Sequence, residues 1–250
     1  MIWQECGGSG DRTILLLHGL GATAAVWTGL RAAIDERGGV RWVAVDLGGH
    51  GGSDWHTLYS VGQLAAQVAP RIATESAPVI VGHSLGAYIG LALASGWFAA
   101  RVRAVLGIGP KIAWSATELT AARDLAARPL RCYASEDEAV ERYRRVSGLN
   151  EALAPERTSL ARGVLRTSEG WRLAQDPGTF GVAGAPFASL VASATCPVVL
   201  ARGEHDPMVS LQQLRAHARA AHDIPGAAHN VHVEAPHAVL ALLEPLLECA

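Results

Sequence analysis

Short apolar runs, each bounded by turn residues, recur over residues 1–110 and 190–250. Five have the length of a strand: "TILLLHG" (13–19), "RWVAVDLGG" (41–49), "APVIVGH" (77–83), "RVRAVLGIG" (101–109) and "CPVVLARGE" (196–204). Uniformly apolar runs rich in β-branched residues are typical of strands buried on both faces of a parallel sheet. Weaker runs at 2–6 and 221–225 predict an edge strand and a short late strand.

Helical segments alternate with these runs. They are predicted over residues 23–37, 59–75, 84–96, 210–220 (with Ser210 as N-cap) and 236–248 (beginning at Pro236). Regular alternation of strand and helix predicts βαβ units with right-handed crossovers. We therefore expect an α/β fold with a mostly parallel central sheet and helices on both faces.

The alternation stops between about 111 and 190. This stretch is charged and Arg-rich, and three of its segments have helical character: 116–128, 135–146 and 155–167. Because a structureless loop of this length is uncommon in a compact domain, we predict a helical insertion without strands. The expected organisation is a core of residues 1–110 and 190–250 with a helical lid at 111–189.

Composition narrows the possible classes of protein. The 250 residues, of which 50% are hydrophobic, suffice for one α/β domain with an insertion, and the net charge of -2 argues against a nucleic-acid partner. No apolar run is long enough to span a membrane, and "MIWQECGGSG" lacks the pattern of a signal peptide. Cys6, Cys132, Cys196 and Cys249 have no metal-like spacing. We expect reduced thiols in a cytoplasmic protein without metal or cofactor.

One serine lies where a strand is predicted to become a helix. In "VIVGHSLGAYIG" (79–90), Ser84 stands between Gly82 and Gly86. A nucleophile on such a turn needs strained backbone angles and small neighbours, which G-x-S-x-G provides, although a helix-capping serine is the simpler alternative. The backbone N–H of Leu85 then lies at a helix N-terminus, where it can stabilise an oxyanion.

A serine nucleophile needs a base, and the base needs an orienting carboxylate. Asp206 follows the apolar run at 196–204, and His229 lies between the last predicted strand and the terminal helix. Glu204 and Asp223 compete for the role of the acid, but the first is close to the strand end and the second is within a strand. His83, His232 and His237 compete for the role of the base and are expected to point elsewhere, His232 as a structural residue near Glu234.

Five segments together resemble the α/β-hydrolase superfamily: "HGLG" (18–21), "DLGGHGGS" (46–53), "GHSLG" (82–86), "GEHD" (203–206) and "AAHNVHVEAP" (227–236). The resemblance covers the core, residues 1–110 and 190–250, whereas the lid matches only in its position along the chain. It implies the α/β-hydrolase fold, with the following residues in the site: Ser84 as nucleophile, His229 as base, Asp206 as acid, and the backbone N–H groups of Leu20 and Leu85 as oxyanion hole. Ala228 and Gly48 depart from the Gly and Arg that relatives often carry.

The serine at position 84 narrows the range of possible reactions. Dehalogenases and epoxide hydrolases of this superfamily use Asp at the corresponding position, so Ser84 argues against both. We predict a hydrolase of carboxylic esters acting through an acyl-enzyme on a small molecule. Lactonase, thioesterase and carbon–carbon hydrolysis of ring-fission diketones remain alternatives, and a slow-turnover ligand receptor of the same fold is a further one.

Aromatic residues of the insertion are candidates for the substrate pocket. Either they line an apolar acyl site or they pack the lid onto the core. Lys111, the only lysine, is a candidate for binding an anionic substrate, with a surface salt bridge as the alternative. The aromatic candidates are Trp114, Tyr143, Trp171 and Phe180, followed by Tyr133 and Phe187.

Overall fold

A seven-stranded sheet forms the centre of the protein, in a computed structural model that describes residues 1–72, 77–149 and 160–248. The spatial order is β1-β3-β2-β4-β5-β8-β9; β1 pairs antiparallel with β3, and every other pair is parallel. The strands are β1 (Gln4–Gly8), β2 (Thr13–Leu17), β3 (Arg41–Val45), β4 (Val79–His83), β5 (Ala104–Ile108), β8 (Val198–Gly203) and β9 (Ala220–Ile224).

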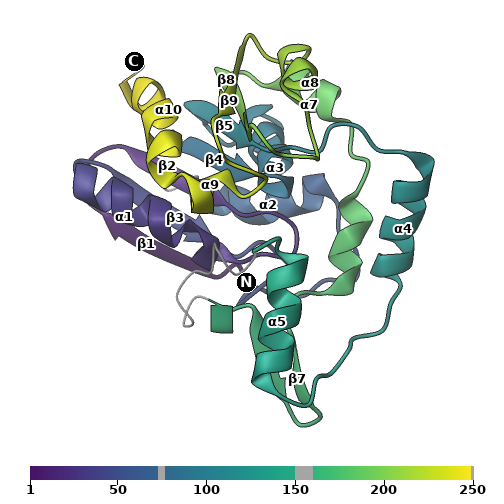
Figure 1. Ribbon diagram of the computed structural model, residues 1–250. Helices are drawn as coiled ribbons and strands as arrows, with labels where there is room; N and C mark the ends of the chain where they lie inside the picture. The colour runs from purple at the N-terminus through teal and green to yellow at the C-terminus, as the bar shows by residue number, and fades with distance from the viewer. Residues whose placement is uncertain (73–76, 150–159, 249–250) are drawn as a thin grey trace.

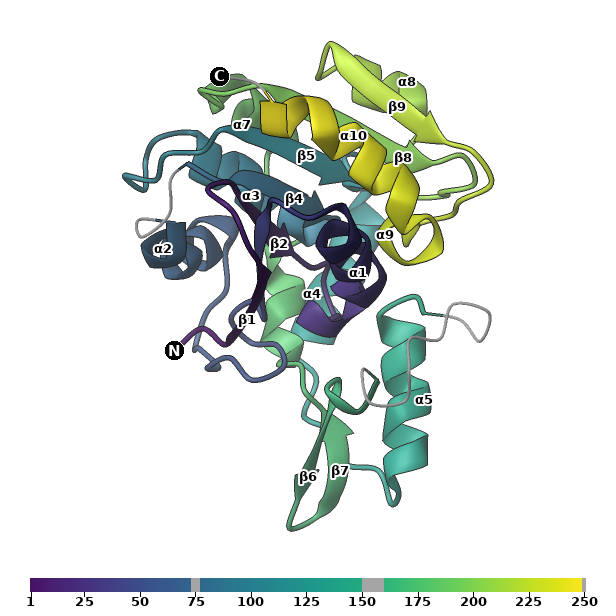
Figure 2. The ribbon, with the colours of Figure 1, turned by 90° about the vertical axis from the view of Figure 1, so that its left-hand side faces the viewer.

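Helices cover both faces of the sheet (Figures 1 and 2). On one face, α1 (Thr28–Arg37) packs against α10 (Pro236–Glu248), together with η1 (Ala24–Trp27) and α9 (Val231–Glu234). On the other face, α3 (Leu85–Ala94) packs against α2 (Val61–Ile72) and α7 (Phe187–Ser193). The predicted α/β fold with a mostly parallel sheet is confirmed.

The strand β2 explains why the predicted runs are apolar throughout. Ile14 and Leu16 belong to the hydrophobic core on the α1 side, whereas Leu15 and Leu17 belong to the core on the α2 side. Successive side chains of a strand point to opposite faces, so a strand covered on both faces needs apolar residues at every position.

The insertion between β5 and β8 contains two of the three predicted helices. α4 (Ala116–Ala126) begins with a capping box formed by Ser115 and Glu118, and the Ser135 side chain caps α5 (Glu136–Val146). α5 extends away from the sheet beside a small hairpin (Figure 2). The remaining elements are η3 (Pro177–Val182) and α7, whose Phe187 and Leu190 are buried in the core on the α2 side.

The prediction of a helix over 155–167 is wrong for its last part, because residues 160 and 161 are helical but residues 164–167 form a strand. Residues 155–159 lie outside the described residues, but β6 (Val164–Thr167) pairs antiparallel with β7 (Gly170–Leu173). Gly170 has a positive φ of 123°, which permits the tight connection, and Trp171 also bridges to Tyr133. Cross-strand pairing therefore overrides the helical pattern, and the expectation of an insertion without strands is corrected.

The last predicted helices differ in their outcome. α10 has the predicted bounds, whereas α8 (Leu211–Arg215) covers only the first part of 210–220, because β9 begins at Ala220. No helix within the described ranges is long and apolar enough to cross a membrane.

Candidate active site

Ser84 occupies a strained turn between β4 and α3. Its φ of 49° and ψ of -110° lie outside the ordinary regions for a residue with a side chain. A Cβ on Gly82 would lie 2.3 Å from the backbone of Gly86, and one on Gly86 would lie 2.0 Å from the carbonyl oxygen of Leu17. Both glycines are therefore required for strand and helix to approach so closely, as the sequence predicts.

The turn that carries Ser84, which we call the elbow, is hydrogen-bonded to the neighbouring strand β5. The backbone N–H of Ser84 donates to the carbonyl of Ile108, at the end of β5, over 2.8 Å. Leu85 is the first residue of α3, so its N–H belongs to the helix end that carries partial positive charge. Leu20, Leu85 and Ser84 all line one cavity.

His229 and Asp206 are hydrogen-bonded. His229 Nδ1 lies 2.9 Å from Asp206 Oδ2, and the backbone N–H of Met208 donates to Asp206 Oδ1 over 2.8 Å. The Asp206 side chain is fully buried, while that of His229 is partly exposed and lines the same cavity as Ser84. Since the carboxylate accepts at Nδ1, the Nε2 side of the imidazole is left to face the cavity.

The strand ends explain how these residues meet. Ser84 follows β4, Asp206 follows β8, and His229 comes after β9, all at the carboxyl edge of parallel strands. Gly109, at the end of β5, has a φ of 57°, and a Cβ there would lie 3.0 Å from Asp206 Oδ2 and 3.2 Å from His229 Nδ1. A side chain at this position would displace the pair.

The rival carboxylates have other partners. Glu204 accepts from the backbone N–H of Gly226, and Asp223 forms an ion pair with Arg202. His237 is an exposed residue of α10, in agreement with the prediction that it faces away.

Glu234 holds the loop that carries His229, a role that the sequence did not reveal. Its two carboxylate oxygens accept from the backbone N–H groups of Ala228, over 2.5 Å, and Asn230, over 3.1 Å. These residues flank His229 on either side, so Ala228 fits this turn without glycine. The signal in the sequence that could have indicated this role is a carboxylate, Glu234, shortly after His229.

His83 does not point away from the site as predicted. Its ring lies 4.6 Å from that of His229, and its Nε2 is 3.0 Å from the His229 carbonyl oxygen. Burial, reinforced by His232 and His229, lowers the pKa of His83 well below its usual range. A neutral His83 therefore supports the backbone of His229.

His232 is a buried structural residue, as predicted, although its contacts are with other rings. It lies between Trp27 and His83, with ring centroids 4.4 Å from each. Within the described part of the chain, neither of its nitrogens has a hydrogen-bond partner. Burial, followed by the effects of His229 and His18, lowers the pKa of His232 to about 3.

Two further buried histidines join the loops behind the cavity. His18 Nε2 accepts from the backbone N–H of Leu47, and His50 Nε2 accepts from that of Gly21. Burial lowers the pKa of His18 to about 4 and that of His50 to about 3. Both are neutral near pH 7, which allows them to accept these hydrogen bonds.

The cavity beside Ser84 has a volume of about 270 Å³. Tyr88 is one residue that sequence reasoning missed; it lies one helical turn after Ser84, and its hydroxyl donates to the Lys111 carbonyl. Further missed residues of the lining are Val146, Val182, Ala183, Ala185 and Met208.

The aromatic candidates divide into two groups. Trp114 and Phe180 line this cavity. Tyr143 is buried in the core on the α1 side, with its hydroxyl 3.3 Å from Thr23 Oγ1, and Trp171 packs against the same core. The prediction that these last two contact substrate is therefore corrected, because their surface is used to pack the insertion.

The two remaining candidates also pack elsewhere. Phe187 is buried against Tyr88, with ring centroids 5.1 Å apart, and Tyr133 pairs with Trp171. Lys111 lines the cavity but its Nζ lies 2.7 Å from Glu118 Oε1, which is the salt bridge that the sequence left as the alternative.

Gly48 stands where relatives often carry an arginine, and another arginine contacts the nearby Asp46. A Cβ at Gly48 would lie 2.2 Å from Gln67 Oε1, so a side chain here would require the Gln67 side chain to move. The buried Asp46 instead forms an ion pair with Arg162 of the insertion, over 3.2 Å. The guanidinium of Arg162 also lies over the ring of Trp3, at 3.6 Å.

No group of residues suited to hold a metal ion occurs in the described part of the chain. The candidate site consists of a serine on a strand-to-helix elbow, a histidine bound to a buried carboxylate, and an apolar cavity. This constellation defines a class of α/β proteins equipped for nucleophilic catalysis.

Comparison with known proteins gives the family. Residues 14–242 match the Alpha/beta hydrolase family. The chain therefore belongs to this family, and membership supports hydrolase chemistry.

Two curated proteins are similar to the chain. Esterase Rv0045c of Mycobacterium tuberculosis (strain ATCC 25618 / H37Rv) is 29% identical over 97% of this chain and 84% of that protein. The pimeloyl-[acyl-carrier protein] methyl ester esterase of Edwardsiella ictaluri (strain 93-146) is 35% identical, but over only 36% of this chain and 33% of that protein.

Solved structures share the fold. A thioesterase domain from the curacin biosynthetic pathway has a TM-score of 0.79 at 23% identity, covering 97% of this chain and 94% of that chain.

Proposed function

We propose that this protein hydrolyses carboxylic esters of small molecules through an acyl-enzyme. The proposal is carried by one observation: the elbow residue Ser84 and His229 line the same cavity, and His229 Nδ1 lies 2.9 Å from the buried Asp206 carboxylate. The names of two relatives, both esterases, support the choice of esters among acyl substrates.

In the proposed first step, Ser84 Oγ attacks the ester carbonyl while His229 Nε2 takes its proton. Asp206 holds the imidazole with its proton on Nδ1 and stabilises the imidazolium that forms. The backbone N–H groups of Leu20 and Leu85 stabilise the oxyanion of the tetrahedral intermediate, aided by the N-terminus of α3. His229 then protonates the departing alcohol.

In the second step, water replaces the alcohol. His229 removes a proton from the water as it attacks the acyl carbon, and returns the proton to Ser84 when the acid leaves. The insertion forms part of the acyl site through Trp114, Val146 and Phe180. We propose that this segment acts as the lid that selects the acyl chain. A cavity of about 270 Å³ favours short acyl chains.

The test is a series of p-nitrophenyl esters from C2 to C16 on the wild type and on Ser84→Ala. We expect turnover that is greatest for a short chain and that falls by about 10⁴-fold or more in the variant. Ser95→Ala is the matched control, since Ser95 lies at the other end of α3 and only caps that helix.

Labelling by a fluorophosphonate separates the alternatives. Near-wild-type turnover by Ser84→Ala would refute the mechanism. A labelled Ser84 with no ester turnover would instead indicate another acyl substrate, a carbon–carbon bond, or a slow receptor.

A further inference from the structure

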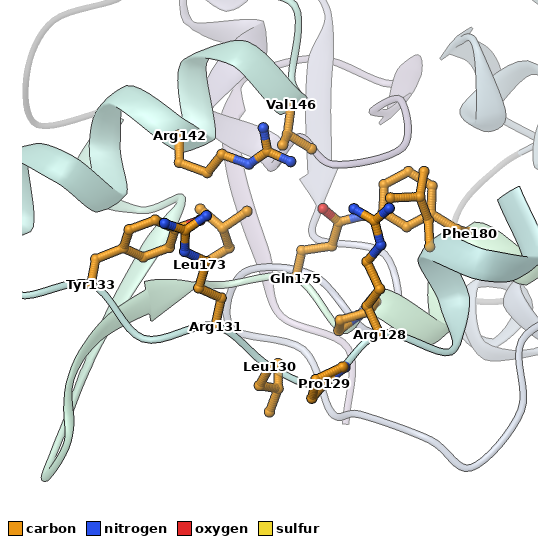
Figure 3. A pocket seen from close by; sticks show the side chains of 12 residues that line it. Arg128, Pro129, Leu130, Arg131, Tyr133, Arg142, Val146, Leu173, Gln175 and Phe180 are labelled. Atoms are coloured by element: carbon orange, nitrogen blue, oxygen red, sulfur yellow. The ribbon is translucent and has the colours of Figure 1, made fainter. Parts of the chain in front are cut away.

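A second hollow lies next to the proposed active site, within the insertion. It has a volume of about 160 Å³ and is formed by the link after α4, by α5, and by the segment that follows β7. Figure 3 shows the guanidinium groups of Arg128, Arg131 and Arg142 arranged around it, with the rings of Tyr133 and Phe180 at opposite ends. We call this hollow the arginine groove. Leu125, Leu130, Val146, Leu173 and Pro177 supply its apolar lining.

The three arginines of the groove have no acidic partner within the described residues, whereas several other cations of the insertion do. Lys111 pairs with Glu118, and Arg162 pairs with Asp46. Even on α5, Arg144 and Arg145 both pair with Glu141. Three like charges around one hollow repel one another, and an anion placed among them relieves that repulsion.

The acidic residues close to the groove are already engaged. Glu138 accepts from the backbone N–H of Ala134, and Glu141 binds Arg145. Both glutamates line an adjacent hollow together with Arg131 and Arg142, but within the described residues neither forms an ion pair with an arginine of the groove, so the guanidinium donors are not taken up by a carboxylate.

The groove adjoins the cavity beside Ser84. Val146 and Phe180 line both, so these two side chains form a shared wall between the arginines and the proposed nucleophile. A substrate whose ester lies at Ser84 would have to pass these two side chains to reach the groove. Its apolar lining suits a methylene stem, and the guanidinium fork suits a carboxylate or a phosphate.

We propose that the arginine groove binds an anionic group of the ester or thioester substrate. The proposal rests on the proposed function, because it identifies the groove as part of the same substrate site. The anion is carried either on the acyl chain, as a terminal carboxylate, or on the leaving group, as a phosphate. In both cases the groove determines specificity, and the chemistry at Ser84 is unchanged.

Two matched pairs of substrates test the proposal and identify the source of the charge. Mono-p-nitrophenyl adipate is compared with p-nitrophenyl hexanoate, and hexanoyl-coenzyme A is compared with the N-acetylcysteamine thioester of hexanoic acid. We expect the charged member of one pair to have the higher kcat/KM, mainly through a lower KM. This preference should weaken as salt is added, since exposed charges are screened.

The variant R128Q/R131Q/R142Q removes the charge and keeps a polar side chain at each position. We expect its preference for the charged substrate to fall by about tenfold, with an unchanged thermal unfolding midpoint as the check of folding. Arg123→Gln is the matched control, because Arg123 is an exposed residue of α4 outside both cavities. Its selectivity should equal that of the wild type.

Equal kcat/KM within both pairs, or an unaltered preference in the triple variant, would overturn the proposal. If the protein cleaves none of these esters, a direct measurement of ligand binding still tests the groove. Calorimetry on Ser84→Ala, with and without the three Arg→Gln changes, measures the affinity for monomethyl adipate and for coenzyme A. Binding that depends on the arginines supports the groove even if the esterase function fails. Absence of binding to either compound refutes the groove alone.

Discussion

The surroundings of Ser84 and the insertion between β5 and β8 are held in different ways. Around Ser84, backbone contacts at Gly82 and Gly86 leave no space even for a methyl group, and a Cβ at Gly109 would lie 3.0 Å from the Asp206 carboxylate. The insertion is attached by side chains, such as Arg162 on Asp46 and Asn230 on the Gly148 carbonyl, and by one β-bridge between His50 and Gln175. The proposed chemistry is thus fixed by the backbone, whereas the proposed specificity depends on side chains that substitution can change without unfolding the sheet.

The largest expected effect concerns the acid of the site. Asp206→Asn should lower kcat by about 10⁴-fold, because an amide no longer holds His229 with its proton on Nδ1. Steady-state kinetics on a p-nitrophenyl ester measures the effect. Asp223→Asn is the matched control, since this carboxylate pairs with Arg202 away from the cavity. An equal loss in both variants would contradict the assignment of Asp206.

The next prediction tests the rigid backbone of the elbow. Gly86→Ala places a Cβ 2.0 Å from the Leu17 carbonyl oxygen, so we expect a loss of about 3 kcal/mol or more in the free energy of unfolding, or failure to fold. Gly62→Ala in α2 meets nothing within 4 Å and should stabilise the protein by about 0.5–1 kcal/mol. Urea denaturation measures both. Equal stability of the two variants would refute the comparison.

A smaller effect is expected where the insertion meets the core. Arg162→Gln removes the ion pair with Asp46 and the contact with Trp3, and should cost about 1–2 kcal/mol, since two backbone N–H groups still satisfy Asp46. Arg166→Gln, at an exposed position of β6, should change nothing. Thermal unfolding of both variants provides the measurement, and identical midpoints would mean that Arg162 is not an attachment point.

The smallest effect is a dependence of stability on pH. The folded state keeps the pKa of His232 at about 3, below the unfolded value of 6.5, so protons bind preferentially to the unfolded chain below pH 6.5. Stability should therefore fall as pH drops from 6.5 towards 3, with His232 contributing at most about 1.4 kcal/mol per pH unit.

His232→Phe tests this contribution, because it keeps the ring between Trp27 and His83 and removes the titration. Urea denaturation at pH 7.5 and pH 5.5 should show a shallower decline than in the wild type. His237→Gln, at an exposed position of α10, is the control. An undiminished slope in His232→Phe would assign the acid sensitivity to other groups, such as His18 and His50.

The sequence by itself determined the sheet and the elbow. The consecutive apolar residues 14–17 of β2 and 79–81 of β4 indicate strands covered on both faces, and the glycines around Ser84 are required by local geometry. Such signals lie within a few consecutive residues. Because backbone sterics and the alternation of side chains act over the same short range, these residues alone decide the local structure.

The tertiary structure decided what depends on distant partners. Trp171 pairs with Arg166 within the β6–β7 hairpin, which the helical pattern at 155–167 concealed, and also bridges to the distant Tyr133. His83 contacts the backbone of His229, although the two are far apart in the chain. The arginine groove forms because α5 brings Arg142 beside Arg128 and Arg131 (Figure 3). These arrangements follow from packing between remote segments, for which no local pattern exists.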